Sequence, residues 1–245
     1  NQILIIILRK GDFMSIYQRE DKYIKFLSER EYTVKELASK LFLSEPTVRR
    51  DIVILEKKDI VVRKNGKVNL KINAADKRIP LFIRNMEQQQ EKREIALKAV
   101  SHIKDGDVIM LDASTTAYCM LPYLANFKEI LVITNGAKTA IELAAIGIKT
   151  ICTGGQLTEE SFSYVGTDAE SILNRYNADV AFFSSRGITE EGVVTDNSIL
   201  ENSMRKIMIK NSKKSYLLCD KSKLGKTYLN TLCHIKELDG LITNK

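Results

Sequence analysis

The sequence predicts an α/β protein made of a small basic module of helices and a hairpin, followed by a larger domain with a mainly parallel sheet. Residues 1–73 hold 16 of the 38 basic residues but only 10 of the 31 acidic ones, so they carry almost all of the net charge of +7. An Asn-Gly pair between apolar runs marks a hairpin there, and helical and strand patterns alternate from Glu91 onward. We therefore expect domains at 15–73 and 91–245, joined by a linker at 74–90.

The composition excludes several classes of protein. An apolar content of 44%, with 3 Pro and 12 Gly in 245 residues, is that of a chain with a packed core and not of a disordered or fibrous one. No apolar run approaches the roughly 18–20 residues of a membrane span, so we expect no membrane partner. The four Cys lack the paired spacing of a zinc site or a disulfide framework. These features predict a cytoplasmic protein with free thiols and no bound metal.

The apolar run Ile3–Leu8 lacks the layout of a signal peptide. Its basic pair, Arg9 and Lys10, follows the run instead of preceding it, and no small-residue cleavage site comes after. Because Met14 opens a more ordinary sequence, we expect that translation naturally starts at Met14.

Three helices are predicted in the basic module. Apolar residues recur at helical spacing within 17–29, which indicates a first helix. Thr33 and Glu36 have the spacing of a capping box, so a second helix is expected to run from there through Leu41. After a short break, Ser44 is a good N-cap for a third helix that ends near Lys57.

A hairpin completes the module. Strand-like runs at 60–63 and 67–70 flank Asn65-Gly66, which is a strong signal for a type I′ turn. Two helices joined by a tight turn, a supporting helix and a basic hairpin together predict a winged helix-turn-helix. In that motif the second helix of the pair inserts its N-terminal part in the major groove of double-stranded DNA.

The predicted DNA contacts fall on the start of the third helix and on the hairpin. Arg side chains bind guanine or phosphate, Thr meets a thymine methyl, and Glu accepts from cytosine. Any one of these charges alone is better explained as part of a solvated face, whereas the ordered set favours DNA. RNA binding is the weaker alternative, because no aromatic-rich strand platform is present. The predicted contacts are Ser44, Glu45, Thr47, Arg49, Arg50, Arg63, Lys64 and Lys67.

In the second domain, short apolar runs alternate with helical patterns, which predicts a mainly parallel sheet covered on both faces. Ligands of such sheets bind beyond the carboxyl ends of the strands, where this sequence places its polar clusters. The expected strands are Val108–Leu111, Ile130–Ile133, Lys149–Cys152, Val180–Phe183, Ser215–Cys219 and Leu238–Ile242.

Each polar cluster has a functional and a structural interpretation. Ser114–Thr116 stand before a helix, so their hydroxyls either help to bind an anion or simply cap that helix. Asn135-Gly136 lies in the cleft or only forms a turn, and Gly154-Gly155 allows close backbone approach or a tight turn. Asp220 and Lys223 bind a sugar hydroxyl and a phosphate, or pair with each other.

Two sets of motifs resemble the DeoR family of bacterial transcriptional regulators. In the basic module the similar stretches are Val34-Lys-Glu-Leu-Ala38, Leu43-Ser-Glu-Pro-Thr-Val-Arg-Arg-Asp51, Leu55-Glu56 and Arg63. In the second domain they are Leu111-Asp-Ala-Ser-Thr-Thr116, Val132-Ile-Thr-Asn135, Gly154-Gly155, Ala181-Phe-Phe-Ser-Ser-Arg-Gly187, Glu201 and Asp220-Lys-Ser-Lys223. The chain departs from the family pattern at Lys58-Asp59, at the wing turn, and at Ser114, where many members have Gly.

The resemblance implies a second domain folded like ribose-5-phosphate isomerase and a phosphorylated sugar as effector, with no cofactor. By carry-over, Asp112, Arg186 and Glu201 are further candidates for the effector site. The residues first expected to bind the effector are Ser114, Thr115, Thr116, Asn135, Gly155, Asp220 and Lys223.

The resulting hypothesis is a DNA-binding repressor of a sugar or polyol catabolic operon that a phosphorylated sugar releases from its operator. We expect a homo-oligomer, a dimer or tetramer, that presents paired recognition helices. The alternative is a sugar-phosphate isomerase-like enzyme with an appended DNA-binding module, with Asp112, Glu201 and Asp220 as candidate bases. Because neither His102 nor His234 lies in a strand-end cluster, we expect no catalytic residue.

Overall fold

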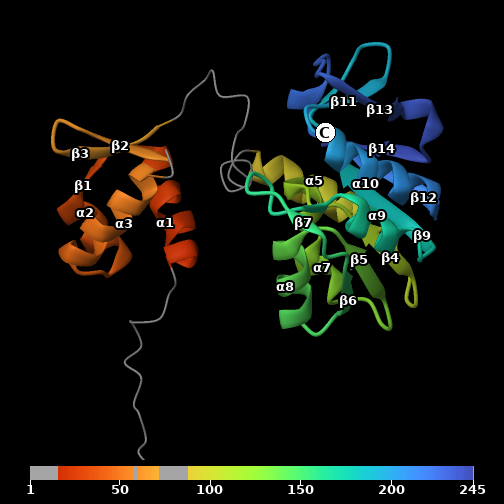
Figure 1. Cartoon of the computed structure of the whole chain (residues 1–245), viewed down its shortest axis with the longest axis horizontal. Coiled ribbons are helices and arrows are strands. Elements are labelled where there is room, and N and C mark those ends of the chain that lie inside the picture. The colour runs from red at the N-terminus through yellow and green to blue at the C-terminus, as the bar shows by residue number, and fades with distance from the viewer. Residues whose placement is uncertain (1–15, 58–59, 72–87, 245) are drawn as a thin grey trace, which may run out of the picture. The chain divides into compact units, whose positions relative to one another are not determined.

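A computed structural model describes residues 16–57, 60–71 and 88–244, which belong to two compact units of the chain (Figure 1). The first unit contains the helices and the hairpin of the basic module, and the second contains the larger α/β domain. The expected start at Met14 and most of the expected linker 74–90 lie outside the described residues. Within the described ranges, no helix has both the length and the apolar character that crossing a membrane requires.

The first unit is a winged helix-turn-helix. Its three helices and its antiparallel three-stranded sheet, in the order β1-β3-β2, have the predicted arrangement, although β1 was not foreseen. Tyr23, Leu37, Val48, Ile52 and Leu55 are fully buried between them. The elements are α1 (Ile16–Glu29), β1 (Tyr32–Thr33), α2 (Val34–Leu41), α3 (Glu45–Lys57), β2 (Val61–Lys64) and β3 (Lys67–Leu70).

Local signals set the ends of these elements. The Thr33 hydroxyl accepts a hydrogen bond from the Glu36 N–H at 3.2 Å, and the Glu36 carboxylate accepts one from the Thr33 N–H at 2.8 Å, which completes the capping box. That backbone bond, with help from Arg30, lowers the pKa of Glu36 to about 2. Asn65 and Gly66 have φ of 53° and 74°, as a type I′ turn requires.

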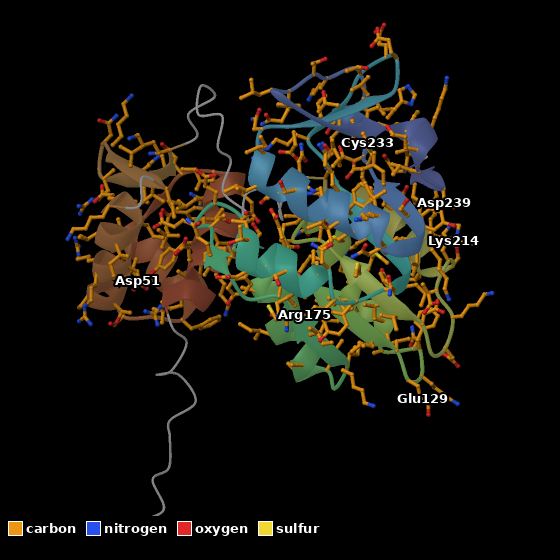
Figure 2. The ribbon with its side chains drawn as sticks, turned by 45° about the vertical axis from the view of Figure 1, so that its right-hand side comes forward. Asp51, Glu129, Arg175, Lys214, Cys233 and Asp239 are labelled. Atoms are coloured by element: carbon orange, nitrogen blue, oxygen red, sulfur yellow. The ribbon has the colours of Figure 1, made fainter. Side chains whose placement is uncertain are left out.

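A buried carboxylate fastens α1 to α3. Asp51 of α3 (Figure 2) is 2% exposed and accepts bidentate hydrogen bonds from Arg19 of α1 at 2.8 and 3.0 Å. The Tyr23 hydroxyl donates to the same carboxylate at 3.1 Å. Burial, together with the charge of Asp51, raises the pKa of Tyr23. The Asp of the Arg-Arg-Asp motif is therefore structural, while the two arginines before it stay exposed.

The second unit contains a six-stranded sheet in the order β14-β12-β9-β4-β5-β6, and every neighbouring pair is parallel. It therefore agrees with the predicted mainly parallel sheet. The strands are β4 (Val108–Leu111), β5 (Leu131–Thr134), β6 (Lys149–Cys152), β9 (Ala178–Ser184), β12 (Ser212–Leu218) and β14 (Gly240–Ile242).

Helices cover both faces of this sheet (Figure 1). Side chains that alternate along β4 enter different apolar clusters, since Ile109 and Leu111 belong to one and Met110 to the other. The first cluster includes residues of α5, α6, α7 and α8, and the second includes residues of α9 and α10. These helices are α5 (Gln89–Val100), α6 (Thr115–Tyr118), α7 (Leu121–Leu124), α8 (Ala137–Ala145), α9 (Thr167–Leu173) and α10 (Ile199–Lys210).

The strand order reverses between β4 and β9. The strands that follow β4 directly, β5 and β6, lie on one side of it, whereas β9, β12 and β14 lie on the other. A reversal of this kind leaves a crevice beyond the carboxyl ends of the two central strands. The chain places three of its polar segments, 112–116, 184–187 and 220–223, at the ends of β4, β9 and β12.

Several short strands were not predicted. A hairpin of β7 (Gln156–Leu157) and β8 (Tyr164–Val165) follows β6. A second antiparallel sheet joins β10 (Gly187–Ile188), β11 (Val193–Asp196) and β13 (Asn230–His234). These runs are two to five residues long, too short for a reliable period of two. The predicted last strand also begins later than expected, at Gly240, because the Leu238 N–H still bonds to the Ile235 carbonyl at 3.2 Å and closes the 3₁₀ turn Ile235–Glu237.

We expect Asp51→Ala to lower the free energy of unfolding of the first unit by about 3 kcal/mol, because it leaves Arg19 and the Tyr23 hydroxyl without their buried partner. Urea denaturation of the full chain measures this loss. Glu45→Ala is the matched control, since its carboxylate is half exposed and meets Arg49 only at 3.5 Å. A loss from Asp51→Ala no larger than that from Glu45→Ala would contradict the structural role of Asp51.

Candidate functional site

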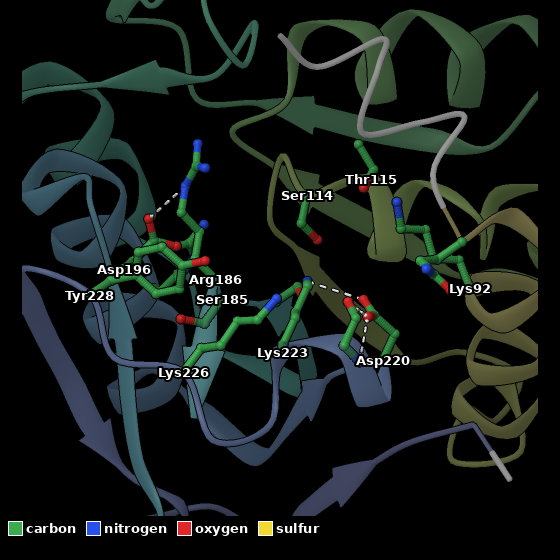
Figure 3. A pocket seen from close by; sticks show the side chains of 14 residues that line it. Lys92, Ser114, Thr115, Ser185, Arg186, Asp196, Asp220, Lys223, Lys226 and Tyr228 are labelled. Atoms are coloured by element: carbon green, nitrogen blue, oxygen red, sulfur yellow. Dashed lines mark hydrogen bonds and ion pairs between the residues drawn. The ribbon is translucent and has the colours of Figure 1, made fainter. Parts of the chain in front are cut away.

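A pocket of about 170 Å³ opens beyond the carboxyl ends of β4, β9 and β12 (Figure 3). Hydroxyls and cationic side chains dominate its lining. The reversal of strand order and the antiparallel sheet together create the pocket, since β11 and the segment before β13 supply part of its wall. Its described lining consists of Gln88, Lys92, Ser114, Thr115, Ser184, Ser185, Arg186, Asp196, Arg205, Asp220, Ser222, Lys223, Lys226 and Tyr228.

The segment after β4 supplies two hydroxyls to the pocket, those of Ser114 and Thr115. Ser114 also caps α6, because its hydroxyl accepts from the Ala117 N–H at 3.2 Å. Asp112 lies behind this turn and accepts from the backbone N–H groups of Ser114 at 3.1 Å and Ser184 at 3.2 Å. The predicted capping role is thus present, and it leaves Ser114 on the pocket wall.

Asp220 and Lys223 both line the pocket, and they also pair with each other. The Lys223 ammonium donates to the Ser184 hydroxyl at 2.8 Å and lies 3.7 Å from the Asp220 carboxylate. Asp220 additionally accepts from the Ser222 N–H at 3.1 Å, which starts the 3₁₀ turn Lys221–Lys223. Ser184 and Asp220 therefore hold the Lys223 ammonium in a defined place beyond the carboxyl ends of β9 and β12.

Three further cations of the lining come from segments far apart in the chain, and the sequence did not indicate that these segments meet. Arg186, one of the further candidates for the effector site, lines the pocket together with Tyr228, and Lys226 enters from the loop before β13. Lys92 of α5 is 3% exposed and was missed altogether. A signal existed, because Lys92 shares a helical face with Ile95, Ala96 and Ala99, all fully buried. A lysine on the apolar face of a helix calls for an explanation.

A buried arginine holds the pocket floor together. Arg205 of α10 bonds to Asp112 at 3.1 Å, to Asp196 at 2.9 Å and to Glu201 at 3.1 Å. Its side chain is 6% exposed. Burial alone would lower the pKa of Arg205, but Asp196, Asp112 and Glu201 outweigh that effect and raise it. Asp112 and Glu201, two of the further candidates for the effector site, thus lie outside the described lining as partners of Arg205.

Asp196 is the carboxylate that connects this buried cluster with the pocket. Burial alone would raise its pKa, but Arg205, the backbone N–H of Ser198 and the nearby Arg186 lower it overall. The Arg186 guanidinium lies 3.6 Å from Asp196. Asp196 is therefore ionised at neutral pH and orients Arg186 at the pocket wall (Figure 3).

Three of the predicted effector residues lie outside the described lining. Thr116 and Asn135 are buried, and their Oγ1 and Oδ1 atoms have no hydrogen-bond partner among the described residues. The Asn135 amide donates to the Tyr164 carbonyl at 3.1 Å, so it ties the end of β5 to β8. At Gly155 a Cβ atom would lie 2.9 Å from the Val165 carbonyl, which accounts for this glycine by close packing.

On the first unit, the predicted DNA contacts of α3 are accessible. Arg49 and Arg50 are exposed, and Arg49 makes only a 3.5 Å contact with Glu45. Ser44 and Thr47 join their hydroxyls at 2.8 Å at the start of the helix. All five predicted residues of this segment lie within two turns at the N-terminal end of α3.

The predicted contacts on the hairpin differ in their surroundings. Arg63 makes a bidentate pair with Glu56 of α3 at 3.0 and 2.6 Å, which raises the pKa of Arg63 and lowers that of Glu56. Lys67 pairs with Glu31, while Lys64 is exposed. Arg63 thus fastens the wing to α3, a structural role that the sequence did not reveal, and Lys64 projects from the hairpin.

Comparisons with protein families match both units. A model of the DeoR-like helix-turn-helix domain matches residues 19–71, and a model of the DeoR C terminal sensor domain matches residues 87–245. The uncharacterized HTH-type transcriptional regulator YulB of Bacillus subtilis is 34% identical over 94% of this chain and 90% of its own length. The regulator GolR of Listeria innocua is 33% identical over 93% and 90%. The lactose phosphotransferase system repressor of Staphylococcus epidermidis is 28% identical over 94% and 93%.

Two solved structures of low sequence identity are similar to parts of the chain. Ribose 5-phosphate isomerase A from Methanocaldococcus jannaschii is similar over 56% of this chain and 55% of its own, with a TM-score of 0.43 and 20% identity. eIF2B delta from Chaetomium thermophilum is similar over 94% of this chain and 72% of its own, with a TM-score of 0.50 and 15% identity. At 15% identity, the similarity to eIF2B delta concerns the fold alone.

We expect Arg205→Met to lower the free energy of unfolding by about 3–5 kcal/mol at pH 7, because it leaves three carboxylates without their common cation. Without the guanidinium, burial becomes the dominant influence on Asp196 and raises its pKa. Protonation then relieves the penalty, so the deficit relative to the wild type shrinks as pH falls from 7 toward about 4.5. Urea denaturation at both pH values, with the exposed neighbour Lys206→Met as control, measures it. A deficit independent of pH would contradict this account.

Proposed function

Because the chain belongs to the DeoR family of transcriptional regulators, we propose that it represses a sugar or polyol catabolic operon and leaves its operator when a phosphorylated sugar binds. Residues 15–73 are the DNA-binding domain in this proposal, 74–90 the linker and 91–245 the effector domain. The pocket at the reversal of strand order carries the proposal, because its lining joins cations with hydroxyls. These are the groups that bind a phosphate and the hydroxyls of a sugar.

The lining suggests a division of roles within the pocket. The phosphate is held by Lys92 and Lys223 together with the hydroxyls of Ser114 and Thr115. The sugar lies toward Ser185, Arg186 and Tyr228, where donors and the ring of Tyr228 face its hydroxyls. Asp220 keeps Lys223 in place and accepts from a sugar hydroxyl. One of the relatives is the lactose phosphotransferase system repressor, which supports a carbohydrate as the inducing molecule.

On the first unit, Arg49 and Arg50 read bases in the major groove and Lys64 reaches the phosphates or the minor groove. Ser44 and Thr47 place the helix start, and Arg63 and Lys67 act mainly by fixing the wing. A homo-oligomer, a dimer or tetramer, would present two such helices at about 34 Å or a multiple of it. Because the operator lies on the chromosome, the protein works in the cytoplasm.

An isomerase reaction on the same sugar phosphate is the weaker candidate. It requires a carboxylate that is free to move a proton between adjacent carbons. Of the carboxylates in the described lining, Asp196 is held by Arg205 and Arg186, and Asp220 by Lys223 and Ser222. We therefore propose a sensor without catalysis. Incubation with candidate sugar phosphates, followed by product analysis, is expected to yield ligand-dependent release of DNA and no product.

We expect Arg49→Ala to lose specific operator binding while sugar-phosphate binding persists. Loss of one bidentate contact with a base costs about 1–3 kcal/mol, or roughly ten- to a hundredfold in affinity. The assay is a mobility shift on an operator selected from a random pool of duplexes. Lys57→Ala, an exposed basic residue at the other end of α3, is the control. Equal losses for both variants would indicate a general effect of charge and contradict base recognition by Arg49.

We also expect Lys223→Ala to bind the operator but no longer to respond to the effector at the concentration that releases the wild type, because it removes the ammonium that Ser184 and Asp220 hold in the pocket. Mobility shifts with and without sugar phosphate measure the response. Lys221→Ala is the matched control, since Lys221 is exposed on the same 3₁₀ turn and does not line the pocket. Normal release of DNA by Lys223→Ala would show that this ammonium is not part of the effector site.

A further inference from the structure

Lys92 differs from the other cations of the pocket in its burial and in the element that carries it. It is 3% exposed, whereas Lys226 is exposed and 21% of the Lys223 side chain is accessible. It enters the pocket from α5 on the side of Thr115, and Arg186 and Tyr228 line the opposite side (Figure 3). A buried ammonium at the pocket wall gains a strong charge-assisted hydrogen bond when an anion arrives.

The place of α5 in the chain gives Lys92 a special connection. The chain leaves the DNA-binding unit after β3, and α5 is the first described element of the second unit. Gln88, the first described residue of that unit, also lines the pocket. Lys223 follows β12, Lys226 precedes β13 and Arg186 follows β9, so each lies much farther along the chain from the DNA-binding unit.

The first turn of α5 begins at a residue with an unusual backbone conformation. Gln88 occupies the N-cap with φ of 54° and ψ of 37°, which is a left-handed conformation. For a residue other than glycine this conformation costs about 1 kcal/mol, because its Cβ atom lies too close to the following carbonyl oxygen. The Gln88 side chain does not cap a backbone N–H, but its amide donates to the Glu91 carboxylate at 2.8 Å. From the second turn onward, Ile95, Ala96 and Ala99 are fully buried in the apolar cluster under the sheet. Residues 88–92 therefore bring together a strained N-cap and a buried lysine, both of which line the pocket.

We propose that Lys92 transmits effector binding to the DNA-binding unit. An anion bound by the Lys92 ammonium draws the first turn of α5 into a different arrangement and thereby moves the point at which the chain enters the second unit. The remaining cations of the pocket contribute affinity for the anion but not this displacement. The inference rests on the proposed function of the pocket as a sugar-phosphate site, and it assigns the coupling between the two ligands to one residue.

The test compares Lys92→Met with Lys226→Met in the full chain. Each variant removes one ammonium from the pocket, so each is expected to weaken sugar-phosphate binding by roughly ten- to a hundredfold. Titration calorimetry with ribose 5-phosphate, fructose 6-phosphate and glycerol 3-phosphate gives the affinities and the concentration that saturates each variant. At saturation, Lys226→Met is expected to release the selected operator as the wild type does. Lys92→Met is expected to keep its operator affinity within about twofold of the ligand-free value.

Hydrogen exchange provides a readout that a change in affinity alone does not alter. Saturating sugar phosphate is expected to change the exchange of the amides in 88–95 in the wild type and in Lys226→Met, but not in Lys92→Met. Lys92→Arg, which retains the charge, is expected to recover part of the release.

Three results would overturn the proposal. Full release of DNA by saturated Lys92→Met would show that the signal takes another route. Absence of any sugar-phosphate binding by Lys92→Met would make Lys92 a binding residue only. An equal change in the hydrogen exchange of residues 88–95 in Lys92→Met and Lys226→Met would lead to the same conclusion. If none of the sugar phosphates binds or releases the wild type, the proposed function itself fails together with the coupling.

Discussion

The buried guanidinium of Arg205 is the interaction on which the geometry of the pocket depends. It meets Asp112 at the end of β4, Asp196 at the end of β11 and Glu201 on its own helix. These residues come from the parallel sheet, the antiparallel sheet and the helix between them. A cation shared by three carboxylates in a region of low dielectric constant fixes their relative positions, because removal of any partner leaves an uncompensated buried charge.

Fixed positions below the pocket determine what its wall can do. The Asp112 carboxylate also accepts hydrogen bonds from the backbone N–H groups of Ser114 and Ser184. These bonds hold together the two segments that present hydroxyls to the pocket. Asp196 turns toward Arg186, and Ser163 donates to Glu201 at 3.0 Å, which extends the cluster toward the β7–β8 hairpin. With these carboxylates engaged below, the wall offers Lys92, Lys223 and Lys226 together with hydroxyls. That composition suits an anion with a polar body.

Much of the fold was predictable because its signals are local. The capping box at Thr33 and Glu36, the turn at Asn65-Gly66 and the alternating apolar runs each act within a few residues of the chain. The pocket lining was predictable where it follows a strand end, as for Ser114, Thr115, Asp220 and Lys223. Gly155 and Asn135 have similar sequence surroundings, yet they lie outside the described lining, where Gly155 packs closely on Val165 and Asn135 donates to the Tyr164 carbonyl.

The sequence by itself determined the two units, the basic recognition helix with its wing, and the strand ends at which polar residues collect. Only the tertiary structure decided which charges meet. Arg205 is 93 residues from Asp112, Lys92 precedes the first strand of the sheet, and Arg63 pairs with Glu56 and so fixes the wing. The physical reason is that caps, turns and periodicity depend on near neighbours in the chain. Burial and ion pairing depend on distances that exist only after distant segments have packed together.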